Sequence, residues 1–119
     1  MTYNPKPMPL DPDKVPGLSS KLLTSHHDNN YIGAVKRLNA IAASLKALDW
    51  PTAANFTING LKREELVAMN SMILHELYFA SLGPTGTPDG ALAQALTRNF
   101  GSVEAWSNEF AAPAATPRR

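Results

Sequence analysis

Apolar residues recur at helical spacing between Leu18 and Leu48, a stretch that contains no proline. Residues three and four apart lie on one side of an α-helix, so such a stripe favours burial against a partner. The residues of this stripe are Tyr31, Val35, Leu38, Ile41, Ala42 and Leu45. The pattern predicts a long helix over residues 18–48. Glycine costs about 1 kcal/mol relative to alanine inside a helix, so Gly33 indicates a bend, a close backbone contact or a division into two segments.

A second helical pattern covers residues 61–82, after a linker over residues 49–60 that ends in an Asn-Gly turn signal. Glu64 and Glu65 stand in the early turns of this helix, where carboxylates suit the positive end of the helix dipole. Two long helices joined by a short linker pack antiparallel and bury their apolar stripes against each other. Residues 18–82 are therefore expected to form a helical hairpin domain.

Residues 1–17 are rich in proline, which lacks a backbone donor and restricts the residue before it, so they predict an extended arm. The prolines of this arm are Pro5, Pro7, Pro9, Pro12 and Pro16. At the other end, residues 111–119 show no packing pattern and are expected to form a disordered tail.

Residues 83–110 predict a Gly/Pro-rich connection followed by two short helices. Asp89 is a candidate N-cap of the first helix and Ser102 of the second, with Gly101 between them. The apolar residues of these helices are Ala91, Leu92, Ala95, Leu96, Val103, Trp106 and Phe110. The expected fold is thus all-α: a long antiparallel helical hairpin with two short appended helices, a Pro-rich N-terminal arm and a disordered C-terminal tail.

Composition narrows the class of protein. With 119 residues, 44% of them hydrophobic, the chain can build one modest core. A net charge of +1 without blocks of like charge lacks the electrostatic pattern of a nucleic-acid binder. No apolar stretch is long enough to cross a membrane. The absence of cysteine excludes disulfides, thiolate nucleophiles and iron–sulfur clusters, and is compatible with the cytoplasmic location that we expect.

The three histidines, His26, His27 and His75, are the only concentration of candidate chemistry. In an antiparallel hairpin, the first two lie near the start of one helix and His75 lies near the end of the other, on an apolar face. Each has two interpretations: a core histidine hydrogen-bonded to a neighbour, or a ligand of iron, manganese or zinc, for which imidazole is a common donor. Two imidazoles are too few to close a metal site. Ideal helical periodicity favours His27 at the centre of the stripe and places His26 at its edge.

Other polar residues give weaker signals. Asp28 and Glu76 stand beside the histidines, but we expect both to be solvated carboxylates of the helix surface. The serines have no His/Asp partner arrangement, and there is neither a nucleophile elbow nor a phosphate loop, so hydrolase and nucleotide-binding functions are not indicated.

Three stretches resemble the iron/manganese superoxide dismutase family. Residues 18–39, aligned through the Leu-Asn pair at their end, resemble the family's first helix and place His26 on the first metal-binding position. Residues 70–79 resemble its second helix, with His75 as the ligand before an aromatic turn. Residues 88–110 are similar to the two helices that open the family's second domain.

The resemblance implies the family's helical hairpin and its chemistry, the disproportionation of superoxide to oxygen and hydrogen peroxide at one iron or manganese ion. It implies His26 and His75 as metal ligands. In the family the remaining ligands, an Asp and a His, come from a sheet-containing region with an Asp-x-Trp-Glu-His type motif, which this chain does not contain. A helix bend near Gly33 would reconcile His26 with the periodicity that favours His27.

Three positions depart from the family pattern. The family's tyrosine at the substrate channel aligns with Ala34, and a nearby channel histidine aligns with Tyr31. Tyr31 is the residue that would substitute for one of them beside the metal. Ser71 stands where some members carry a glutamine that hydrogen-bonds the metal's solvent ligand.

Two functions are consistent with these features. The first is an enzyme of the superoxide dismutase type, with superoxide as its substrate, whose site is completed by another segment or chain. The second is a metal-free superoxide-dismutase-like scaffold or interaction subunit. In either case apolar surface left exposed on the helices predicts a homo-oligomer or a partner chain that covers it.

Overall fold

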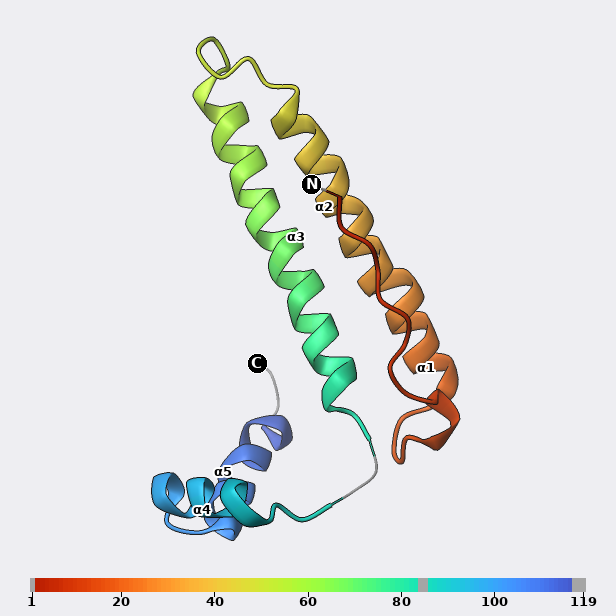
Figure 1. The fold of residues 1–119 in the computed structure, drawn as a ribbon, viewed down its shortest axis with the longest axis vertical. Coiled ribbons are helices and arrows are strands. Elements are labelled where there is room, and N and C mark those ends of the chain that lie inside the picture. Colours follow the sequence, from red (N-terminus) through yellow and green to blue (C-terminus); the bar gives the residue numbers. More distant parts are fainter. Residues whose placement is uncertain (1, 84–85, 117–119) are drawn as a thin grey trace. The chain divides into compact units, whose positions relative to one another are not determined.

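The computed structural model describes residues 2–83 and 86–116, and within them every regular element is a helix (Figure 1). The chain divides into two compact units, Met1–Pro84 and Thr85–Arg119. The expected all-α fold is therefore confirmed for the described part of the chain. None of its helices is both long and apolar enough to cross a membrane.

The first long helix is a continuous run of three segments, α1 (Ser20–Ser25), η2 (His26–Tyr31) and α2 (Ile32–Lys46). Ser19 caps its start, since its hydroxyl accepts a hydrogen bond from the Leu22 N–H at 3.2 Å. Segment η2 is a π-helix, in which the Ile32 N–H reaches back to the carbonyl of His27. The helix is thus divided, as one interpretation of Gly33 expected, but the irregular segment ends before Gly33. A Cβ atom on Gly33 would meet nothing within 4 Å, so the expected close contact there is wrong.

The second long helix, α3 (Asn55–Ser81), runs antiparallel beside α2 (Figure 1). It begins within the expected linker, so the turn predicted at Asn59-Gly60 is wrong. The Thr57 and Ile58 N–H groups donate to the Ala54 carbonyl at 2.9 and 3.1 Å. These bonds start the helix earlier, and packing along α2 outweighs the weak helix propensity of one glycine.

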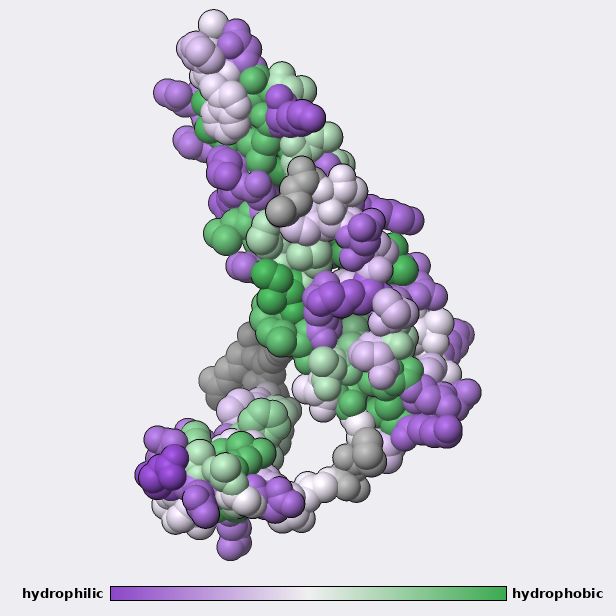
Figure 2. Space-filling model, viewed as in Figure 1, coloured by the Kyte–Doolittle hydropathy of each residue, from purple (hydrophilic) through white to green (hydrophobic). Residues whose placement is uncertain are grey.

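The hairpin core lies where the predicted stripe meets α3. One cluster of buried residues contains Leu23, Tyr31, Val35 and Phe79, and the other contains Leu38, Ile41, Leu45 and Ala68. The predicted stripe is confirmed at all positions except Ala42, which is only partly buried. Apolar side chains also remain exposed on α3, and Figure 2 shows hydrophobic surface along that helix.

The N-terminal arm runs along α2, as Figure 1 shows, and contains one short turn, η1 (Pro12–Lys14). Tyr3 and Asn39 bind each other twice: the Tyr3 N–H donates to the Asn39 side-chain oxygen, and the Asn39 amide donates to the Tyr3 carbonyl, both at 2.8 Å. Tyr3 also packs against both core clusters. The extended arm is confirmed, and it is attached to the helix surface.

The second unit contains α4 (Gly90–Phe100) and α5 (Val103–Ala115), separated by Gly101 at φ +88°. The Ser102 hydroxyl accepts from the Ala105 N–H at 2.9 Å, which confirms the expected cap. Helix α5 continues past Phe110, so the expectation of disorder is wrong up to Ala115. Four of the residues 111–115 are alanine, which has the highest helix propensity, and the helix continues through Pro113. Residues 117–119 lie outside the described part.

Candidate metal centre

His26 and His75 meet across the hairpin. His26 lies on η2 and His75 on α3, and their Nε2 atoms are 3.0 Å apart. The ring centroids are 4.8 Å apart, with the ring planes at 76°. The structure thus brings together the two residues that the sequence analysis selected as candidate ligands.

The π-helical segment explains why His26 takes this place instead of His27. A π-turn inserts one residue into the helical repeat, which rotates the preceding residues by about 100° relative to a regular α-helix. His27 is buried, 7% exposed, beneath the arm, with Nδ1 2.8 Å from the Asp28 carboxylate and Nε2 3.1 Å from the Lys6 carbonyl. Periodicity was right that His27 is buried but wrong that it is the histidine that faces His75.

Hydrogen bonding orients the His75 ring. Its Nδ1–H donates to the Ser71 carbonyl at 2.6 Å, and the Ser71 hydroxyl lies 3.3 Å from the same nitrogen. This arrangement leaves the lone pair of His75 Nε2 directed at His26. Burial, followed by the nearby His75, lowers the pKa of His26 and favours its neutral form. Neutral imidazoles with converging Nε2 atoms are the form in which histidine binds a metal.

Aromatic rings enclose the pair on the α3 side. The Tyr78 and Phe79 ring centroids lie 5.3 and 5.4 Å from that of His26. Phe79 is 2% exposed and stacks with His75 at 6.4 Å. These contacts restrict the two imidazoles and shield one side of them from water.

Tyr31 lies beside the pair but does not bind either histidine. Its ring centroid is 6.3 Å from that of His75, and its hydroxyl donates to Glu76 Oε1 at 3.0 Å. The Lys6 N–H donates to the same hydroxyl at 2.8 Å, and the Lys6 ammonium pairs with Glu76. Burial raises the pKa of Tyr31, whereas the Lys6 ammonium holds the pKa of Glu76 below its usual value.

The two acidic candidates have different surroundings. The Asp28 side chain is 57% exposed, in agreement with a solvated carboxylate. Glu76 is only 22% exposed and is bound by Tyr31 and Lys6, so the expectation of a solvated Glu76 is wrong. Within residues 2–83 and 86–116 no group of three or more His, Cys, Asp or Glu side chains is placed to hold a metal ion. The described residues therefore provide two imidazoles, those of His26 and His75, as candidate metal ligands.

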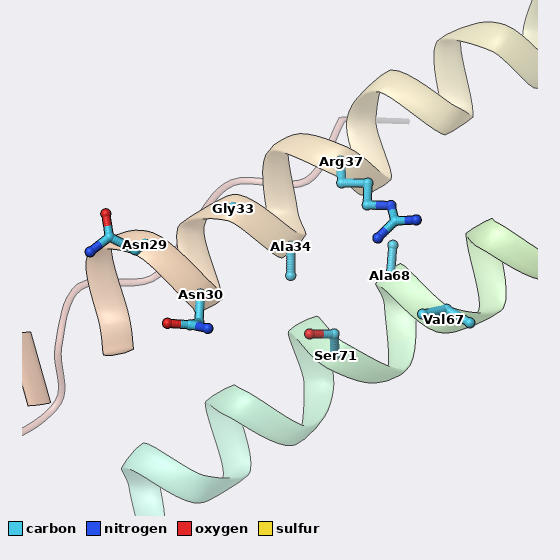
Figure 3. A pocket seen from close by; sticks show the side chains of 8 residues that line it. All are labelled: Asn29, Asn30, Gly33, Ala34, Arg37, Val67, Ala68 and Ser71. Carbon is cyan, nitrogen blue, oxygen red and sulfur yellow. The ribbon is translucent and has the colours of Figure 1, made fainter. Parts of the chain in front are cut away.

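A hollow of about 300 Å³ lies between the two long helices beside Ser71. In Figure 3, Ala34 on α2 and Ser71 on α3 lie opposite each other across it. The other lining residues are Asn29, Asn30, Gly33, Arg37, Val67 and Ala68. Ser71 connects the hollow to the candidate centre, since its hydroxyl and carbonyl both lie against His75.

Lys6 was not predicted from the sequence, and the expectation of a solvated Glu76 was wrong. Lys6 contacts residues 21, 25 and 70 positions away through its carbonyl, amide and ammonium groups. An extended arm has no periodicity that predicts such partners. The one feature of the sequence that could have indicated a role for Glu76 is its position directly after the candidate ligand His75.

Comparison with known proteins identifies a group of relatives, although no family model matches the sequence. The chain is similar to an iron superoxide dismutase of Cupriavidus metallidurans, with 62% identity over 112 residues, 94% of this chain and 57% of the relative. It is 35% identical over 125 residues to a manganese superoxide dismutase of Haloferax volcanii, covering 96% of this chain and 58% of the relative. An iron superoxide dismutase of Aquifex aeolicus is 30% identical over 112 residues, 88% of this chain and 53% of the relative. The chain spans about half the length of these relatives.

Proposed function

Because this chain is a homologue of the N-terminal half of iron and manganese superoxide dismutases, we propose that His26 and His75 are two ligands of one iron or manganese ion. The observation that carries the proposal is the 3.0 Å separation of their Nε2 atoms. Two nitrogens this close, one of them with its lone pair directed at the other, suit neighbouring positions around a cation. The remaining ligands come from a segment or chain outside the described residues.

The proposed activity is the disproportionation of superoxide. A bound iron or manganese ion supplies the one-electron chemistry by which two superoxide ions and two protons give dioxygen and hydrogen peroxide. The residues of this chain hold and orient the two imidazoles that would bind the ion. Ser71 fixes the His75 ring through Nδ1, which also raises the basicity of Nε2. Phe79 packs against both imidazoles and limits their rotation.

The hollow between Ala34 and Ser71 is the route that we propose for superoxide. It is large enough for a diatomic anion, and Ser71, which lines it, lies against His75. Arg37 lines its wall and adds positive charge, although it is paired with Glu64. The short Ala34 side chain leaves this space open.

The metal-free scaffold is the less favoured function, because packing two half-buried imidazoles edge to edge without a cation gains little. Exposed apolar residues on α3, among them Leu66, Leu74 and Leu77, support a partner chain or a second copy as the covering surface. The cytoplasmic location stays a prediction that rests on the lack of cysteine.

Manganese titration of the metal-free chain, followed by NMR, tests the ligand assignment. Paramagnetic Mn²⁺ is expected to broaden the ring signals of His26 and His75 before those of His27. The single variants His26→Gln and His75→Gln should each reduce the broadening of the candidate ligand that remains, whereas the matched control His27→Gln should leave the broadening of His26 and His75 unchanged. Equal broadening of all three histidines in the wild-type chain, or broadening of one candidate ligand that is unaffected by loss of the other, would contradict the proposal.

A further inference from the structure

Glu76 lies one residue after His75 on α3 and connects three parts of the chain. Its Oε1 accepts from the Tyr31 hydroxyl at 3.0 Å, at the end of η2, and its other carboxylate oxygen pairs with the Lys6 ammonium of the arm. Tyr31 is 1% exposed, so this hydrogen bond is shielded from water. Loss of the acceptor would leave a buried hydroxyl with a donor and no partner for it.

The Tyr31 hydroxyl is both a hydrogen-bond acceptor and a hydrogen-bond donor. It accepts from the Lys6 N–H at 2.8 Å and donates to Glu76. The Lys6 ammonium pairs with the other oxygen of the same Glu76 carboxylate. A charged acceptor makes this a stronger hydrogen bond than a neutral one.

His26 lies on the same π-helical segment, η2, as Tyr31. Segment η2 begins at His26 and ends at Tyr31, while His75 and Glu76 are neighbours on α3. The two ends of the π-segment therefore each contact α3, His26 through His75 and Tyr31 through Glu76. A π-turn is rare and persists where surrounding contacts favour it over a regular α-helix. The Tyr31–Glu76 bond is such a contact.

We propose that Glu76 is a positioning residue for the His26/His75 pair: with Lys6 it anchors Tyr31, holds η2 in its π-helical form and so keeps His26 opposite His75. This inference rests on the proposed function only for its consequence in metal binding. Glu76 is not a third ligand, because both of its carboxylate oxygens are bound by Tyr31 and Lys6. Its effect on the centre passes through the placement of His26.

The test uses variants of the 119-residue chain that separate the parts of this contact. Glu76→Met removes the acceptor at similar side-chain length, Glu76→Gln keeps an oxygen for Tyr31 but removes the charge, and Tyr31→Phe removes only the hydroxyl. Glu65→Gln is the matched control, since Glu65 is also an acidic residue of α3 that pairs with a lysine, Lys62. Circular dichroism establishes that each variant keeps its helices.

The first readout needs no metal. In the wild-type chain, ring protons of His26 and His75 should show a nuclear Overhauser contact. Glu76→Met and Tyr31→Phe should each lose it, Glu76→Gln should restore most of it, and Glu65→Gln should leave it unchanged. If the contact survives in Glu76→Met and Tyr31→Phe, the positioning role is wrong, whatever the chain binds.

The second readout is the affinity for Co²⁺, followed by its visible absorption. Glu76→Met should weaken binding about tenfold, the lower end of the effect of residues that orient metal ligands. Glu76→Gln should recover most of the affinity, and Tyr31→Phe/Glu76→Met should be no weaker than either single variant, because both remove one interaction. If the wild-type chain fails to bind Co²⁺ while the Overhauser contacts respond as expected, the metal function fails and the positioning role stands.

Discussion

The Nε2 atoms of His26 and His75 lie 3.0 Å apart although 49 positions separate the two residues in the chain. Two features of the fold produce this contact. The antiparallel packing of α2 against α3 brings the two helix regions to the same level, and the π-segment η2 turns His26 toward α3.

Deleting Asn29 should convert η2 into a regular α-helix. Asn29 is exposed, and its side-chain amide donates a hydrogen bond to the Ser25 hydroxyl at 3.0 Å, a surface contact of small energy, but the deletion rotates the preceding helix by about 100°. His26 then leaves His75, and Leu23, which is fully buried, turns outward. We expect the Overhauser contact between His26 and His75 to vanish, with a destabilisation of about 1.5–3 kcal/mol from the exposed leucine. Replacing Asn29 with alanine, the control, should preserve the contact; if the deletion preserves it too, the π-turn does not set the register.

The ion pair of Glu76 should make stability depend on pH. The Lys6 ammonium, which pairs with the carboxylate, lowers the pKa of Glu76 in the folded chain from its ordinary value of 4.5. The folded state then binds fewer protons than the unfolded state, so the pair's stabilisation is complete above pH 4.5 and declines as the pH falls through the lower folded pKa. Urea unfolding at several pH values should show Glu76→Gln less stable than wild type at neutral pH and nearly equal to it in acid. A constant difference across this range would show that the charge of Glu76 is not responsible.

Replacing Asn39 with alanine should release the N-terminal arm. The substitution removes both hydrogen bonds to Tyr3, each of them part-buried, and such bonds contribute about 0.5–1.5 kcal/mol. We expect a loss of about 1–3 kcal/mol in urea unfolding and faster amide exchange at Tyr3. Asn70→Ala, at an exposed position of α3, is the control and should change neither quantity.

Core packing at the centre of the hairpin should depend on Leu38. Its side chain is 0% exposed, so Leu38→Ala leaves a cavity and should cost about 2–5 kcal/mol. Leu66 is 61% exposed on α3, and Leu66→Ala should change stability by about 0.5 kcal/mol or less in the isolated chain. Thermal unfolding of the two variants distinguishes them, and equal losses would mean that Leu66 is covered in solution by another chain.

Exposed leucines on α3 should promote self-association. Leu74 and Leu77 are 63% and 61% exposed. Sedimentation velocity should show association of the wild-type chain that Leu74→Glu/Leu77→Glu weakens. Leu22→Glu, at a position 54% exposed on α1, is the control and should leave association unchanged. A monomer at all concentrations would contradict the expectation of a homo-oligomer.

Local periodicity was sufficient to predict the helices and most of the core. The spacing of Val35, Leu38 and Ile41 places them on one helical face, and all three are buried. Such patterns are informative because each turn of a helix repeats the same short-range geometry. Helix ends were less predictable: α3 begins before Asn59-Gly60, and α5 reaches Ala115. Residues beside a stable helix adopt helical conformation even where their own propensity for it is weak.

The candidate ligands were determined in part by the sequence and in part by the tertiary structure. Sequence similarity to one family identified His26 and His75, whereas ideal periodicity favoured His27. Only the folded chain decides which histidine faces His75, because the π-turn of η2 is compatible with the local sequence but is held by contacts outside it. Tyr31 and Glu76 meet across 45 positions, and Lys6 reaches Glu76 across 70. Hydrogen bonds between residues this far apart in the chain cannot be predicted from a local sequence pattern. They form only when the helices and the arm pack together.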